Sequence, residues 1–182
     1  MLELAGFLVG SAGLAYLSRA PLRRPRSHGF FRFFAWECLL GLALLNLRRW
    51  FANPWSIPQL ISWPLLLISA SLAVHGALML RRHGQPRPDR AGEALIGLER
   101  TTALVAEGAY RYIRHPLYSS LFFLGWGIFF KDLTWLGGAL AAASTLCLVI
   151  TAKVEEAEDV RYFGPAYQAY IRRTKRFIPF LF

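Results

Sequence analysis

The sequence predicts an all-α integral membrane protein, because it is strongly apolar and strongly basic at once and its apolar residues lie in separate runs. Of its 182 residues 55% are hydrophobic and 15% aromatic, yet the formal net charge is +10. A soluble domain rarely combines these values, whereas a small membrane protein can confine its charges to loops. We therefore expect a single membrane domain over residues 1–182.

Five apolar runs suit membrane-spanning helices, each of which needs about 20 residues. The first run has no basic region ahead of it, so we expect a span there rather than a cleaved signal peptide. The fourth is short unless its helix also uses His115–Pro116 and Lys131–Asp132. The fifth is rich in glycine and alanine, which lets helices approach closely in lipid. The expected spans are Leu2–Leu17, Phe30–Leu47, Ile57–Leu80, Leu117–Phe130 and Leu133–Ala152.

The basic residues set the expected orientation. With five spans, the segments that follow spans one, three and five share one side of the membrane. Of the 21 Lys and Arg residues, only Arg48, Arg49 and Lys131 fall on the other side. By the positive-inside rule the basic side is cytoplasmic. We expect a multi-pass cell-membrane protein of the bacterial inner-membrane type, with its N-terminus outside and its C-terminus in the cytoplasm.

The cytoplasmic segments carry turn signals and a short amphipathic helix. A linker rich in Pro, Arg and Gly runs from Arg81 to Gly92. Gly164 followed by Pro165 predicts the end of one helix and the start of another. In this last helix Tyr167 and Tyr170 share a face. Such a helix is expected to lie on the membrane surface and to cover something beneath it.

The stretch Gly108–Tyr118 leads a charged, aromatic segment into an apolar helix. The residue before a proline avoids helical geometry, and proline suits the first helical turn. His115 is therefore expected to cap a helix that begins near Pro116. This start would leave unpaired N–H groups beside Arg114, which favours the binding of a small anionic group.

Opposite charges are expected to meet at the cytoplasmic end of the last two spans. The tight turn at Lys131–Asp132 makes these spans antiparallel neighbours, which brings Arg114 close to Glu155 and Glu156. The residues alone leave two interpretations open. One is an interfacial ion pair, worth at most about 1 kcal/mol. The other is a polar pocket, roofed by the C-terminal helix, that accepts a zwitterionic ligand.

Residues 98–182 resemble the isoprenylcysteine carboxyl methyltransferase family, integral membrane enzymes related to the phospholipid methyltransferases. The resemblance rests on several motifs in the family's order and spacing. The matching residues are Leu104-Val105, Gly108, Tyr110, Arg114-His115-Pro116, Tyr118, Glu155-Glu156, Phe163-Gly164, Tyr167, Tyr170, Arg176 and Ile178-Pro179.

The resemblance implies that S-adenosyl-L-methionine (SAM) binds at the cytoplasmic ends of the last two spans, under the C-terminal helix. It implies catalytic roles for Arg114, which would orient the acceptor or the cofactor, and for Glu155 and Glu156, which would hold the cationic end of the cofactor. If the acceptor is an amine, Glu156 could also remove a proton. The residues implied at the cofactor are Thr102, Ala103, Leu104, Val105, Tyr110, His115, Pro116, Leu117, Tyr118 and Glu155.

Two positions depart from the family pattern. Thr151 stands where the isoprenylcysteine enzymes carry an arginine that helps to hold the substrate carboxylate, and Asp159 stands where an apolar residue is usual. The first difference argues against isoprenylcysteine as the acceptor. The expected partners are a lipophilic membrane substrate and membrane lipids.

Two ionisable residues inside the expected spans, Glu37 and His75, are further candidates for substrate contact, because buried charges are costly in a membrane. Alternatively, Glu37 pairs with Arg32 or Asn46, and His75 hydrogen-bonds a neighbouring helix.

Cys38 and Cys147 lack metal-ligand spacing, so no metal is expected. No basic helix or stacking platform lies outside the apolar runs, so no nucleic acid is expected.

Three functions remain open from the sequence. The first is SAM-dependent methyl transfer to a membrane-embedded acceptor, either a phospholipid amine or an isoprenoid thiol or carboxylate. The second is a membrane reductase like the related sterol reductases, although the chain is short for one. The third is a non-enzymatic membrane scaffold subunit.

Overall fold

The computed structural model describes residues 2–85 and 101–181, and within these ranges every regular element is helical. Residues 86–100, which include most of the expected linker and the first residues of the segment 98–182, lie outside the described part. The elements are α1 (Leu2–Leu17), α2 (Arg19–Leu22), α3 (His28–Leu45), η1 (Leu47–Arg49), α4 (Ile57–His83), η3 (Gly108–Arg111), α5 (Pro116–Phe129), α6 (Trp135–Phe163) and α7 (Pro165–Arg173).

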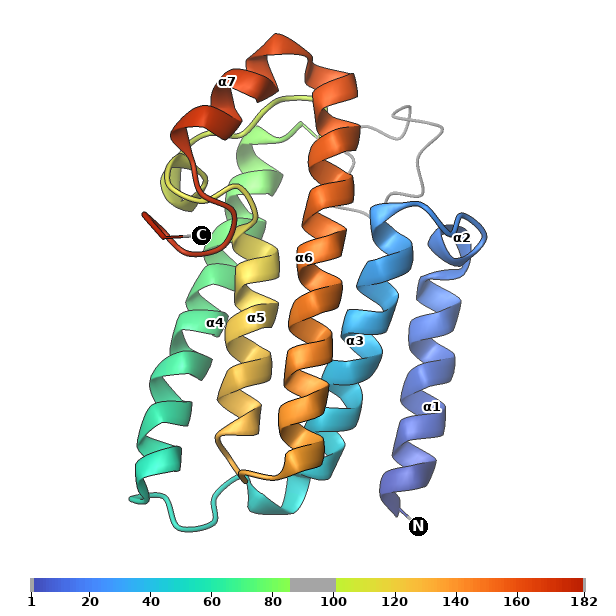
Figure 1. The fold of residues 1–182 in the computed structure, drawn as a ribbon, viewed down its shortest axis with the longest axis vertical. Coiled ribbons are helices and arrows are strands. Elements are labelled where there is room, and N and C mark those ends of the chain that lie inside the picture. Colours follow the sequence, from blue (N-terminus) through green and yellow to red (C-terminus); the bar gives the residue numbers. More distant parts are fainter. Residues whose placement is uncertain (1, 86–100, 182) are drawn as a thin grey trace.

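Five long helices stand side by side and run alternately up and down (Figure 1). α3 packs on α6, α4 packs on α5, and α1 packs on the outer side of α3. α7 lies across the end of the bundle where α6 finishes, and the N-terminus lies at the opposite end (Figure 1).

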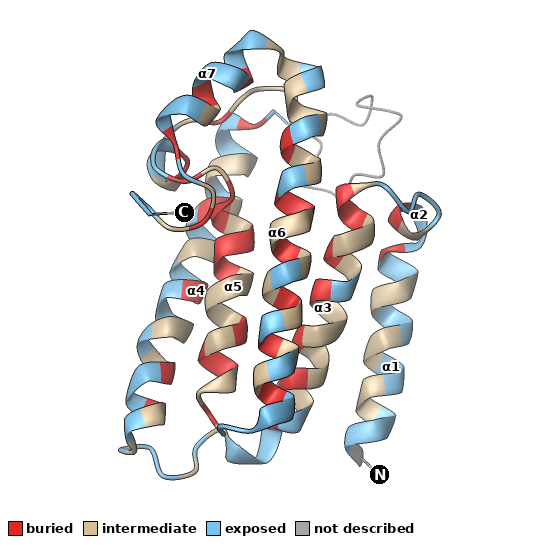
Figure 2. Cartoon of the chain, in the orientation of Figure 1, coloured by how far each residue is buried: buried red, intermediate tan, exposed pale blue. Residues whose placement is uncertain are grey.

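Three of these helices, α3, α4 and α6, are long and apolar enough to cross a membrane, whereas α1 and α5 are shorter apolar helices. The outer faces of α1 and α4 are largely exposed (Figure 2). They present apolar side chains such as Leu8, Leu67 and Val74, which are 61%, 67% and 61% exposed. An apolar outer face of this kind suits contact with lipid chains rather than water.

The helix bounds agree with the sequence except at several ends. α3 begins at His28, earlier than expected, because Ser27 caps it by accepting a hydrogen bond from the backbone N–H of Phe30 at 3.3 Å. α4 continues past Leu80 to His83. α6 continues past the expected end of the span at Ala152 to Phe163, and Gly164 ends the helix as expected.

A tight turn joins α5 to α6 at the end of the bundle opposite α7. The hydroxyl of Thr134 caps α6 by accepting from the N–H of Gly137 at 3.0 Å. The ammonium of Lys131 is buried there, 3.3 Å from the ring centroid of Trp63, and donates to Gln59 Oε1 at 2.9 Å. The Lys131 contacts fix this turn to α4, and α5 and α6 pack against each other as antiparallel neighbours, as the sequence predicted.

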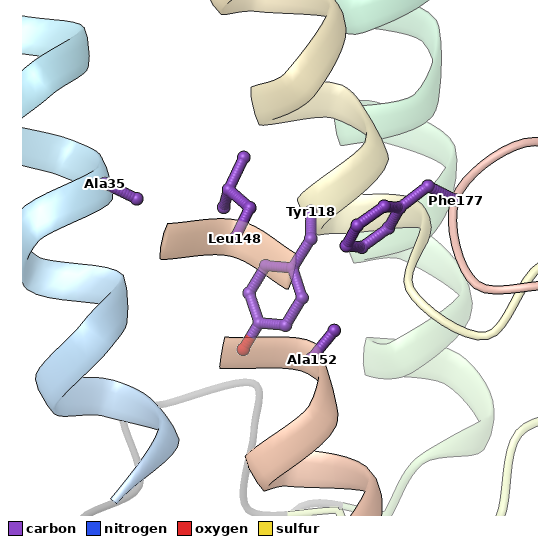
Figure 3. Packing of buried hydrophobic residues seen from close by; sticks show 5 residues of the cluster. All are labelled: Ala35, Tyr118, Leu148, Ala152 and Phe177. Carbon is purple, nitrogen blue, oxygen red and sulfur yellow. The ribbon is translucent and has the colours of Figure 1, made fainter. Parts of the chain in front are cut away.

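A compact apolar cluster fills the bundle near the other end of α5. Figure 3 shows the ring of Tyr118 from α5 beside Phe177 from the C-terminal segment, with Leu148 and Ala152 from α6 and Ala35 from α3. All five residues are buried. Because Tyr118 also lines the pocket described below, this cluster closes the bundle interior beneath that pocket.

Candidate functional site

The site is a pocket produced by the unequal lengths of α5 and α6. α5 has 14 residues and α6 has 29. At 1.5 Å per residue they measure about 21 and 43 Å, and since a short turn joins their far ends, α6 extends roughly 20 Å past the start of α5. α7 folds back over this step (Figure 1). The space below it has a volume of about 90 Å³, which is smaller than the roughly 300–1,000 Å³ of typical ligand pockets.

Residues from five helices and from the segment before η3 line this pocket. They are Leu80 from α4; Thr101, Ala103, Leu104 and Val105 from the segment before η3; Tyr110 from η3; Arg114, His115, Leu117 and Tyr118 from the start of α5; Glu155, Asp159 and Phe163 from α6; and Tyr167 and Tyr170 from α7.

The C-terminal segment fixes the backbone that leads into α5. Ile113 and Lys175 form a parallel bridge. The N–H of Arg114 donates to the carbonyl of Lys175 at 2.8 Å, and the N–H of His115 donates to that of Arg176 at 3.2 Å. The hydroxyl of Tyr170 donates to the carbonyl of Tyr110 at 2.6 Å. The entry to α5 and the α7 roof are therefore held together as one unit.

Glu156 lies at the centre of a charge network beside the pocket. Arg114 Nε donates to its Oε1 at 2.8 Å, and Arg176 donates through Nε to Oε1 at 3.0 Å and through Nη2 to Oε2 at 2.7 Å. His115 Nε2 lies 3.3 Å from the same Oε1. Hydrogen bonding to Glu156 raises the pKa of Arg176. Arg114 also donates to the carbonyls of Ile171 and Thr174. Glu156 does not line the pocket, and its carboxylate is fully engaged.

Glu155 faces a different environment. Its Oε2 and the hydroxyl of Tyr118 are both buried, and the two groups interact with each other and with Arg32. The Nδ1 atom of His115 lies 3.8 Å from that carboxylate oxygen. Asp159 lines the pocket one helical turn further along α6. The carboxylates of Glu155 and Asp159 and the phenol of Tyr118 therefore offer acceptors to a cationic ligand on one pocket wall.

Aromatic rings form the roof and the side of the pocket. The rings of Phe163 and Tyr167 stack with centroids 6.2 Å apart, and Tyr167 meets Tyr170 edge to face at 5.7 Å. Burial raises the pKa of the Tyr110 and Tyr170 hydroxyls well above their ordinary value. Both phenols therefore stay neutral at physiological pH. Aromatic faces of this kind suit a planar heterocycle or a cation.

The start of α5 adds backbone donors to the pocket. His115 is the N-cap and Pro116 opens the helix, as predicted. The N–H groups in a first helical turn have no intrahelical acceptor. Since Leu117 and Tyr118 belong to this turn and line the pocket, the positive end of the helix can receive an anionic group there.

Most of the residues implied at the cofactor line the pocket, but Thr102 and Pro116 do not. The Thr102 hydroxyl instead donates to the carbonyl of Gln85 at 2.8 Å, and Pro116 is buried at the helix start. The sequence interpretation did not assign pocket positions to Leu80, Thr101, Asp159, Phe163, Tyr167 and Tyr170. The shared face of Tyr167 and Tyr170 was a usable signal, whereas nothing local indicated Leu80 or Thr101.

Glu37 and His75 lie away from the pocket. The hydroxyl of Ser11 on α1 donates to Glu37 Oε2 at 2.5 Å. His75 Nε2 accepts from the backbone N–H of Ala109 at 3.2 Å, so it fastens η3 to α4. In residues 2–85 and 101–181, no three His, Cys, Asp or Glu side chains are grouped so that they could hold a metal ion.

The chain shows similarity to one curated enzyme over part of its length. Over 72 residues, 40% of the chain, it is 31% identical to methanethiol S-methyltransferase of Crocosphaera subtropica. The match covers 28% of the length of that relative. No protein-family model and no solved structure matches the chain. The similarity supports a methyltransferase and does not identify the methyl acceptor.

Proposed function

We propose that this protein transfers the methyl group of SAM to a lipophilic acceptor at the membrane surface. The observation that carries the proposal is the carboxylate of Glu155, which lies with Tyr118 on the wall of a pocket that aromatic rings also line. The similarity to a methyltransferase supports the reaction class.

The residues of the pocket fit the chemical groups of SAM. Glu155 and Asp159 suit its ammonium and sulfonium, and the start of α5 suits its carboxylate. The tyrosine rings of α7 suit stacking with adenine, and their electron-rich faces also attract a cation. When bound, SAM supplies a methyl group that its sulfonium already activates.

The chain's own residues are then needed for positioning and for the exclusion of water, rather than as nucleophiles. We assign Glu155 to cofactor binding, beside Tyr118. Arg114 and Glu156 are positioning residues, since their mutual ion pair and the link to Arg176 hold the pocket roof against α5. His115 touches both glutamates and keeps their spacing.

We further propose that all five long helices cross the membrane, with the pocket at the cytoplasmic side. The alternating directions of the helices support this arrangement (Figure 1). Exposed aromatic residues at the opposite end, Trp55 at 85% and Trp135 at 98%, suit the other membrane–water interface.

The acceptor is proposed to enter the pocket from the side. The apolar cluster below Tyr118 closes the route through the bundle interior, which favours an acceptor whose reactive group lies at the interface. The relative's name specifies a thiol, methanethiol, as the group methylated by that enzyme. We therefore rank thiols first among the acceptors, ahead of phospholipid amines and isoprenoid carboxylates.

The test is incubation of purified protein with SAM carrying a labelled methyl group, presented with membrane lipids and separately with small apolar thiols. Mass analysis then identifies the molecule that acquires the label. Label in a thioether supports the ranking, and label in a lipid amine or an ester keeps methyl transfer but reverses the ranking. Absence of label from every acceptor, with SAM bound, contradicts the proposed function.

A further inference from the structure

The chain turns back after α7 and exposes an apolar tip. Figure 1 shows the C-terminal end below α7, near the level of the first turn of α5. In this tip Phe180 is 81% exposed and Leu181 is 78% exposed. The ring of Phe180 lies beside that of the half-exposed Tyr112, with centroids 6.2 Å apart. The tip is therefore an apolar surface with one aromatic neighbour.

Exposed cationic side chains lie in the segments next to this apolar tip. Arg172 and Arg173 at the end of α7, Lys175 in the C-terminal segment, and Arg111 in η3 are all exposed. The guanidinium of Arg111 lies 5.9 Å from the ring centroid of Tyr112. Cations flanking exposed aromatic and aliphatic residues are typical of segments that lie in a membrane interface and attract anionic lipid headgroups.

The structure also fixes where the tip is placed. Phe177 is buried in the apolar cluster, and its carbonyl accepts from the hydroxyl of Ser119 on α5 at 2.8 Å. The bridge between Ile113 and Lys175 fixes the short extended segment that precedes Phe177. With Phe177 fixed inward, Phe180 and Leu181 can only project outward at the level where α5 begins.

We propose that the tip, Phe180 and Leu181, inserts into the cytoplasmic leaflet and that Arg111, Arg172, Arg173 and Lys175 bind the anionic phospholipid headgroups above it. Charge complementarity selects this occupant, because an apolar tip inside a cluster of like charges repels a second copy of itself. The inference rests on the membrane arrangement proposed above and not on methyl transfer.

This contact would tie the roof of the pocket to the membrane. The backbone bonds of Lys175 and Arg176 to the entry of α5 connect the tip with Arg114 and His115, which line the pocket. Anionic lipid would thus stabilise the closed position of α7 over the site.

The test uses the full chain in nanodiscs, with Cys38 and Cys147 replaced by alanine. An environment-sensitive fluorophore is attached at Leu181→Cys, and the matched control carries it at Gln168→Cys on the exposed face of α7. The discs contain phosphatidylcholine alone or a mixture with phosphatidylglycerol, with and without a lipid that bears a quencher near its headgroup.

We expect a blue-shifted emission and strong lipid quenching at position 181, both greater with phosphatidylglycerol, and neither at position 168. Joint replacement of Arg172, Arg173 and Lys175 by glutamine should remove the dependence on phosphatidylglycerol. Water-like, unquenched emission at 181 in anionic discs would overturn the proposal. So would a blue shift without lipid quenching, which indicates contact with a second copy. The signal needs neither SAM nor an acceptor, so failure of methyl transfer leaves this test unaffected.

Discussion

Glu155 and Glu156 are neighbours in the chain, but they have different tasks in the structure. Successive residues on a helix point about 100° apart. This separation puts Glu156 between Arg114 and Arg176 and puts Glu155 on the pocket wall. One carboxylate therefore stabilises the fold, and the other is left for a ligand.

Replacement of Glu156 by glutamine should mainly reduce stability. The change leaves the buried Arg114 with a neutral partner, and breaking a buried ion pair costs about 3 kcal/mol. We expect a clearly lower melting temperature in detergent, measured by circular dichroism or dye binding. Glu3→Gln is the matched control, since the half-exposed pair of Glu3 with Arg48 should contribute less than about 1 kcal/mol. Equal melting temperatures for the two variants would contradict the role of Glu156.

Replacement of Glu155 by glutamine should instead reduce ligand binding. Because Glu155 lacks the guanidinium hydrogen bonds that Glu156 makes, we expect this variant, without ligand, to melt at a higher temperature than Glu156→Gln. SAM should raise its melting temperature less, with an affinity about tenfold weaker, as is typical for the loss of a hydrogen bond to a charged group. An unchanged response to SAM would remove Glu155 from the binding site.

At the scale of the elements, the junction between α6 and α7 depends on one glycine. Gly164 has φ +61° and ψ −135°, a conformation that is essentially restricted to glycine. Nothing lies within 4 Å of the position that a Cβ would occupy there, so a substitution acts through the backbone and not through a clash. This turn directs α7 back over the pocket.

We expect Gly164→Ala to lower the free energy of unfolding by about 1–3 kcal/mol and to weaken SAM binding as the roof loses its position. Gly13→Ala is the control, because Gly13 also has open space around it but lies within helix α1, where alanine should stabilise by about 0.5–1 kcal/mol. If both variants bind SAM as the parent does, α7 is not the roof of the site.

Local signals predicted most of these elements. Pro116 and the Gly164–Pro165 pair gave correct helix boundaries, since each acts through its own backbone. The expected membrane span ended at Ala152, because hydropathy marks the apolar part of a helix, whereas the helix runs on to Phe163, next to the stop expected at Gly164. That extension matters, since it carries Glu155, Asp159 and Phe163.

At the scale of the molecule, the two ends of the bundle differ in their charged and aromatic residues. The pocket and the charge network lie at one end, and Trp55 before α4, Trp135 at the start of α6 and the buried Lys131 after α5 lie at the other. Together with the alternating directions of the five long helices, this asymmetry predicts that the chain crosses the membrane five times.

Cysteine labelling in intact bacterial cells tests that topology. With Cys38 and Cys147 replaced by alanine, a membrane-impermeant maleimide should label Trp55→Cys directly and Arg26→Cys only after the cells are permeabilised. Both positions are exposed. Arg26 lies between α2 and α3 and Trp55 lies just before α4, and these two connections are at opposite ends of the bundle (Figure 1). Direct labelling of both positions, or of Arg26→Cys alone, would contradict the proposed orientation.

The sequence indicated the location of the site but not which of its charged residues pair with each other. The turn after α5 was enough to bring Arg114 to the pair of glutamates. Which glutamate it binds depends on the rotation of α6 and on Arg176, which reaches Glu156 only when α7 has folded back. The closeness of Glu155 to Tyr118 is likewise a property of the packed structure.

The most direct test of the central claim is a calorimetric titration of the purified, folded protein with SAM and with S-adenosylhomocysteine. The pocket between α5, α6 and α7 predicts saturable binding of both molecules at one site per chain. No binding of either molecule, by protein whose fold is verified by its circular dichroism and melting curve, would contradict the account.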